Sequence, residues 1–241
     1  MTETGFPSNL QRLHVKEQSL RKEALGIIQG NSKLELHFSI IERAMTLAKI
    51  IVEYPADDED FKVIKMLSIR MFNAFGASLN LMLSGYHQKS AMVMRDVLEN
   101  LFLMDLFRTD HSAIRRWRFA NDKKSRHEFL PVKVREALDK RDGFKGKKRA
   151  KAYKMLSELA AHPTMGTQYM LKSELGGDIL TGPFMGDTIL RQGLEKLGSL
   201  AAQVGDILHC FLPREYDPED VRVSFIKVQR LWMETFYQHT T

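Results

Sequence analysis

Apolar side chains recur at helical spacing over nearly the whole chain, and this pattern leaves few folds open. Residues three and four positions apart lie on one face of an α-helix. No run of alternating β-branched residues between turn residues predicts a strand. The sequence therefore predicts an all-α fold. One such helical series is Leu34, Phe38, Ile41, Met45, Ala48 and Val52.

Four further segments carry the same pattern. One follows Pro55, begins with acidic residues that suit a helix N-terminus, and ends near Ser84. The segment from about 87 to 107 is apolar on nearly all sides, so it should be the central helix. The last two, 190–211 and 218–238, are predicted to form a C-terminal hairpin.

We therefore predict one domain over residues 1–241, a bundle of about seven or eight helices. Its core spans about 34–211, and the C-terminal helix spans 218–238. Between them, residues 162–186 contain five glycines and two prolines. This composition predicts a long irregular connection.

Cysteine usage and apolar run lengths bear on the compartment. The single cysteine, Cys210, excludes an internal disulfide and is predicted to be a small apolar core residue. The first residues lack an export signal. The 18 residues from Met71 to Gln88 lack charge but contain several amide, hydroxyl and glycine residues. We therefore expect a core helix here, no membrane segment, and a cytoplasmic protein.

Common enzyme motifs are missing. The sequence has no Glu-x-x-His pair, no HExxH zinc motif, no Walker loop, no GxGxxG and no GxSxG elbow. We therefore expect no cofactor and no metal.

Two polar patterns could carry chemistry. Arg95 and Glu99 stand one turn apart in the central helix, where burial would require them to pair. The pair either belongs to a polar site or fixes helix register. Ser157 stands four positions after Tyr153, and His162 stands five positions after Ser157. Pro163 should end the helix at His162. His162 then either acts as an acid or base in a cleft, or satisfies helix carbonyls.

These motifs support a resemblance. The segment 83–107 with Arg-x-x-x-Glu, the later Tyr-x-x-x-Ser-x-x-x-x-His-Pro-Thr and the tripeptide at 182–184 resemble uncharacterised prokaryotic helical proteins related to HEPN bundles. Many HEPN members are dimeric toxin or defence ribonucleases. The resemblance covers about residues 65–210. It implies a HEPN-like core, a homodimer, and a polar cluster of Arg95, Glu99, Ser157 and His162.

The chain departs from the HEPN nuclease pattern at one point. Those nucleases have four to six residues between an arginine and a following histidine, and none of the eight histidines here has an arginine five, six or seven positions before it. We therefore expect a bundle that acts by binding, in a prokaryotic stress or defence system. The alternative is a divergent metal-independent ribonuclease that uses His162 with Arg95 or with an arginine of the basic segment.

The basic segment comprises residues 108–154, with 17 Lys and Arg against 6 Asp and Glu in a chain of net charge +6. Such a concentration attracts phosphate backbones. Three interpretations stay open: contact with a nucleic acid, pairing with acidic groups of a protein partner or of this chain, and simple solvation. The candidate nucleic-acid contacts are Arg115, Arg116, Arg118, Lys145, Lys147, Lys148, Arg149 and Lys151.

Overall fold

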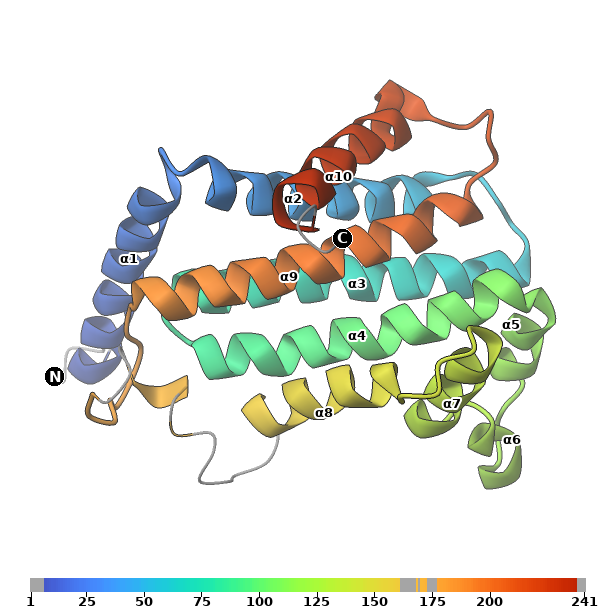
Figure 1. Ribbon diagram of the computed structural model, residues 1–241, viewed down its shortest axis with the longest axis horizontal. Coiled ribbons are helices and arrows are strands. Elements are labelled where there is room, and N and C mark those ends of the chain that lie inside the picture. Colours follow the sequence, from blue (N-terminus) through green and yellow to red (C-terminus); the bar gives the residue numbers. More distant parts are fainter. Residues whose placement is uncertain (1–6, 161–167, 169, 173–176, 238–241) are drawn as a thin grey trace, which may run out of the picture.

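The computed structural model describes residues 7–160, 168, 170–172 and 177–237, and these form helices joined by turns, with no strand (Figure 1). The all-α prediction is confirmed. The α-helices are α1 (Ser8–Ile28), α2 (Ser32–Glu53), α3 (Glu59–Leu83), α4 (His87–Thr109), α5 (His111–Arg118), α6 (Lys123–His127), α7 (Pro131–Arg141), α8 (Lys148–Ala160), α9 (Asp187–Leu208) and α10 (Val221–Tyr237).

The prediction of seven or eight helices was too low, since the described residues contain ten α-helices. The difference arises in the basic segment, where α5, α6 and α7 are short and rich in charged residues. The C-terminal helix begins at Val221, after a 3₁₀ turn over Pro218–Asp220. Residues 177–186 of the irregular connection contain neither helix nor strand.

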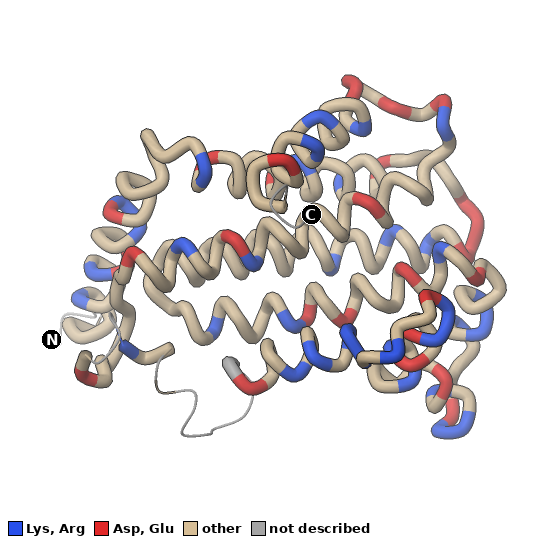
Figure 2. Tube along the Cα trace, viewed as in Figure 1, with Lys and Arg blue, Asp and Glu red and all other residues tan. Residues whose placement is uncertain are grey.

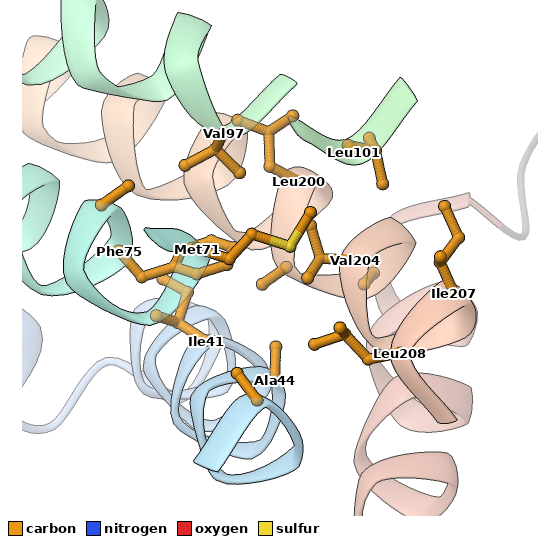
Figure 3. Close-up of a cluster of buried hydrophobic side chains, with 14 of the residues drawn as sticks. Ile41, Ala44, Met71, Phe75, Val97, Leu101, Leu200, Val204, Ile207 and Leu208 are labelled. Atoms are coloured by element: carbon orange, nitrogen blue, oxygen red, sulfur yellow. The ribbon is translucent and has the colours of Figure 1, made fainter. Parts of the chain in front are cut away.

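Four long helices, α2, α3, α4 and α9, enclose the main core. Each sends apolar side chains into one cluster, including Ile41 from α2, Phe75 from α3, Val97 from α4 and Val204 from α9 (Figure 3). Helix α4 also contacts α5, α7 and α8, as its apolar sequence predicts, although Met92 is 39% exposed. Nothing within the described residues is long and apolar enough to cross a membrane.

Helix α10 crosses α2 and α9 on the side away from α4 (Figure 1). The close approach of α10 to α9 depends on Gly205 of α9, because a Cβ atom there would stand 2.1 Å from the buried ring of Phe225 on α10. Farther along α10, the indole N–H of Trp232 donates to Nδ1 of His37 on α2 at 2.8 Å. The histidine ring also stacks on Phe236, 4.4 Å between centroids. These contacts fix α10 on the bundle.

The start of α2 provides a test of local capping. The Asn31 side-chain oxygen accepts from the Leu34 N–H at 3.2 Å and satisfies one donor of the first turn. Asn31→Ala should therefore lower the free energy of unfolding by about 1 kcal/mol, measured by urea titration. Asn31→Asp keeps an acceptor and should stay close to the wild type. Equal losses in the two variants would contradict the capping role.

Candidate functional site

The Arg95–Glu99 pair expected from the sequence is present on α4. Arg95 Nε lies 3.2 Å from Glu99 Oε1, and the two side chains are 32% and 28% exposed. The pair is therefore half-buried, at the side of α4 that faces α7 and α8. Its position makes it part of a solvent-accessible surface and not of the sealed core.

Two arginines from different helices meet at one tyrosine. The guanidinium carbon of Arg95 lies 5.0 Å from the ring centre of Tyr153 on α8, and that of Arg135 on α7 lies 4.0 Å from it. Both distances are in the range of cation–π attraction. The Nε and Nη1 atoms of Arg135 are buried and have no hydrogen-bond partner among the described residues. We call Arg95, Glu99, Arg135 and Tyr153 the arginine–tyrosine cluster.

The other two members of the predicted polar cluster, Ser157 and His162, are not seen to join Arg95 and Glu99. Ser157 lies one turn after Tyr153, but its side chain is buried at 6% exposure and its hydroxyl has no hydrogen-bond partner within the described part of the chain. His162 lies outside the described residues. The structure thus brings Arg95 and Glu99 together and adds Arg135, which the sequence did not single out.

The arginine–tyrosine cluster has the chemistry of an anion site. Guanidinium groups bind phosphate or carboxylate through two parallel hydrogen bonds, and here Glu99 occupies only the Nε of Arg95. No group of three or more His, Cys, Asp and Glu in the described part of the chain could hold a metal ion. The arrangement therefore suits electrostatic recognition.

Several arginines of the basic segment are paired inside the molecule, among them two of the candidate nucleic-acid contacts, Arg116 and Arg118. Arg116 contacts Asp110 and Glu128, both at 2.8 Å. Arg118 contacts Glu59 and Asp60 at the start of α3, both at 3.2 Å. Their charge is thus largely neutralised by this chain, as one of the three interpretations of the segment anticipates.

Arg149 belongs to a larger ion network. Asp105 of α4 accepts from Arg108 at 2.7 Å and from Arg141 at 2.8 Å, and Arg149 lies 3.6 Å away. Arg149 also contacts Asp139 at 3.0 Å and pairs with Asp142. Its side chain is only 14% exposed. We call these six residues the Asp105 network, and they tie α4 to α7 and α8.

The environment of Asp105 shows what the network does. Burial alone would raise the pKa of the Asp105 carboxyl, but hydrogen bonds and charge from Arg141 and Arg108 outweigh burial and lower it. A carboxylate with a lowered pKa stabilises the fold above its unfolded pKa and loses that contribution as the pH falls through the folded value. Asp105 is therefore a structural anion that holds three cations.

Cys210 lies beside this network and not in the core. It is exposed, and its Sγ donates to the Asp206 carbonyl at 3.3 Å. The core prediction was wrong because α9 ends at Leu208, and the following 3₁₀ turn over His209–Phe211 carries Cys210 to the surface.

The remaining cations of the basic segment stay available. Arg115, Lys145, Lys147, Lys148 and Lys151 are exposed and make no ion pair within the described ranges. Figure 2 shows Lys and Arg distributed along α8 and around the adjoining α5–α7 region. The same segment exposes two rings, Phe119 at 59% and Phe144 at 37%. Free lysines beside exposed aromatic rings are typical of single-stranded nucleic-acid contacts.

Comparisons with known proteins add no assignment. No family model, no curated protein and no solved structure matches the chain.

Proposed function

We propose that this protein acts by binding and that its ligand is single-stranded nucleic acid, held by the face of α7 and α8. The observation that carries the proposal is that the basic segment contains two kinds of cation, arginines paired with acids and lysines without an ion pair to any described residue. Arginines buried among acids build the fold, whereas Lys147, Lys148 and Lys151 are exposed and make no ion pair with a described residue. Of these lysines, Lys148 has its ammonium group 4.7 Å from the ring centre of Phe144. Lysines of that kind neutralise phosphates and release counterions on binding.

The arginine–tyrosine cluster adds positive charge to the same helix pair. Tyr153 is two residues beyond Lys151 and so lies on nearly the opposite side of α8, where Arg135 and Arg95 meet at its ring. Because Nε and Nη1 of Arg135 are buried, this arginine adds positive potential near the face and does not contact the ligand directly.

Phe119 and Phe144 are partly exposed, with Arg118 lying 4.8 Å from the first ring centre and Lys148 lying 4.7 Å from the second. When these cations turn to phosphates, the rings can stack on bases, and such stacking needs unpaired bases. Single strands therefore fit better than duplexes.

Fluorescence anisotropy with a mixed-sequence single-stranded RNA tests the proposal. The triple substitution Lys147→Gln, Lys148→Gln and Lys151→Gln should weaken binding at least tenfold at low salt. It should also reduce the slope of log K against log salt by about 2, because three phosphate contacts are lost. The matched control replaces three exposed lysines of α1 and α2: Lys16→Gln, Lys22→Gln and Lys33→Gln. Equal effects of the two triples would show that this face is not the contact.

One contact supports the ribonuclease alternative as a second candidate. Arg95 meets α8 through Tyr153, and α8 is the helix that leads toward His162. The same RNA, incubated without metal, should then be cut, and His162→Ala should abolish cleavage with an unchanged circular dichroism spectrum. RNA that stays intact at high protein concentration would contradict the ribonuclease alternative and leave binding as the only proposed function.

The wider context rests on the sequence. We propose a cytoplasmic homodimer with a HEPN-like core that works in a prokaryotic stress or defence system. Sedimentation velocity measures the dimer directly. An acidic protein is the other ligand that the lysines would suit, and the absence of a salt-dependent anisotropy signal with RNA would favour it.

A further inference from the structure

A small cavity lies apart from the α7–α8 nucleic-acid face, at the end of the bundle where α4 begins. Its volume is about 80 Å³. Helices α3, α4, α8 and α9 each contribute to its wall, together with Met170. Most of the wall is apolar, including Met82, Met94 and Leu156. Methionine side chains adapt readily to a ligand, so this wall suits a flexible apolar group.

One cation lines the cavity. Lys196 of α9 is half-buried and makes no ion pair with any described residue. Burial lowers the pKa of its ammonium group, and the neighbouring Glu195 only partly opposes that shift. An ammonium group withdrawn from water gains most from an anion placed beside it.

A second polar group at the cavity has an unused acceptor. His87, at 4% exposure, contacts the Phe184 carbonyl through Nε2 at 3.1 Å. A carbonyl can only accept, so Nε2 carries the hydrogen and Nδ1 is a bare acceptor. Nδ1 is buried and has no hydrogen-bond partner among the described residues, but as an acceptor it does not bind a carboxylate oxygen, so the anion must be held by Lys196. The first turn of α4, which starts at His87, also has no side-chain cap and no acidic residue.

The ligand class follows from size and charge. About 80 Å³ gives room for several water-sized groups, and hence for a short chain only. One ammonium group selects a single negative charge, whereas a phosphate would require several converging donors. We propose that this cavity binds a small monocarboxylate with a short apolar chain, its carboxylate at Lys196 and its chain against the methionines. This proposal goes beyond the proposed function and does not rest on it.

Isothermal titration calorimetry of the full chain with sodium hexanoate tests the site. We expect saturable binding, and at least tenfold weaker binding of hexan-1-ol, which has the chain without the charge. Lys196→Met keeps the stem, removes the charge and should weaken hexanoate at least tenfold. Arg191→Gln removes a cation of the same helix that pairs with Asp187 instead, and it should leave hexanoate binding unchanged.

A second variant tests the cavity itself. Ala91 lines the wall at 5% exposure, so Ala91→Leu should fill the space and abolish binding while Lys196 remains. If Ala91→Leu does not fold, Lys196→Met decides. The proposal is overturned if millimolar hexanoate gives no saturable heat, if hexan-1-ol binds as well, or if Lys196→Met binds like the wild type. RNA binding by the lysine triple is measured separately, so either proposal can fail alone.

Discussion

Asp105→Ala is expected to lower the free energy of unfolding by about 3–5 kcal/mol, as measured by urea titration followed by circular dichroism. The Asp105 side chain is 9% exposed and pairs with Arg108, Arg141 and Arg149. Removing the Asp105 carboxylate leaves these three arginines around a buried site without the anion that they share. The cost of uncompensated buried charge then exceeds anything that the alanine methyl group regains.

The loss of stability in Asp105→Ala depends on which of the three arginines keep another carboxylate partner. Arg141 and Arg149 retain Asp142, and Arg149 retains Asp139, whereas Arg108 has no second carboxylate within the described residues. Asp105→Asn should lose less than Asp105→Ala, because its amide oxygen still accepts one hydrogen bond.

A neighbouring aspartate provides the control. Asp206 lines the same surface groove as Asp105 but is exposed. Asp206→Ala should therefore change the free energy of unfolding by no more than about 0.5 kcal/mol. If the two alanine variants were equally stable, the Asp105 network would be a surface feature without a structural role.

The long helices could be predicted because their signal is local. A helix with apolar residues three and four apart shows one face whatever its neighbours are, so α2, α3, α4 and α9 appear directly in the sequence. Helices α5–α7 gave no such signal. Only Ala113 and Ile114 are buried in α5, and α6 buries none of its residues. Their formation depends on caps such as Asp110 and Asp122, and on tertiary contacts.

The candidate site divides in the same way. Arg95 and Glu99 could be paired from sequence because they are one turn apart on one helix. Arg135 and Tyr153 meet only because α7 packs on α8. The roles of the basic residues also required the structure. Arg149 and Lys148 are neighbours in sequence, yet Arg149 is held by buried aspartates, whereas Lys148 is exposed and contacts the ring of Phe144.

The second large effect is expected from pH. His37 and His87 are both buried, and burial lowers the pKa of each to about 4. His37 uses Nδ1 as the acceptor for the Trp232 indole, a group that can only donate. Protonation at Nδ1 would abolish that hydrogen bond and place a charge among Trp232 and Phe236. The folded protein therefore requires the neutral ring.

The direction of the pH effect follows from proton uptake. An unfolded chain binds protons to these histidines below about pH 6.5, while the folded protein does not until about pH 4. Their contribution is thus present above about pH 6.5 and is lost as the pH falls toward 4. Between pH 7.5 and 5 we expect a loss of about 2 kcal/mol per histidine, or about 4 kcal/mol together. Urea titrations across this range measure it.

Histidine substitutions separate this loss from the titration of carboxylates. Aspartate and glutamate in the unfolded chain titrate near pH 4, so the decline above pH 5 belongs mainly to histidine. His37→Asn retains an acceptor for Trp232 but does not titrate, and should remove about 2 kcal/mol of the decline. The rest belongs to His87 and to His209, whose pKa burial also lowers. His14→Asn, on the exposed face of α1, should leave the decline unchanged. An equal slope in His37→Asn and wild type would mean that His37 is already protonated, or exposed, in the folded protein.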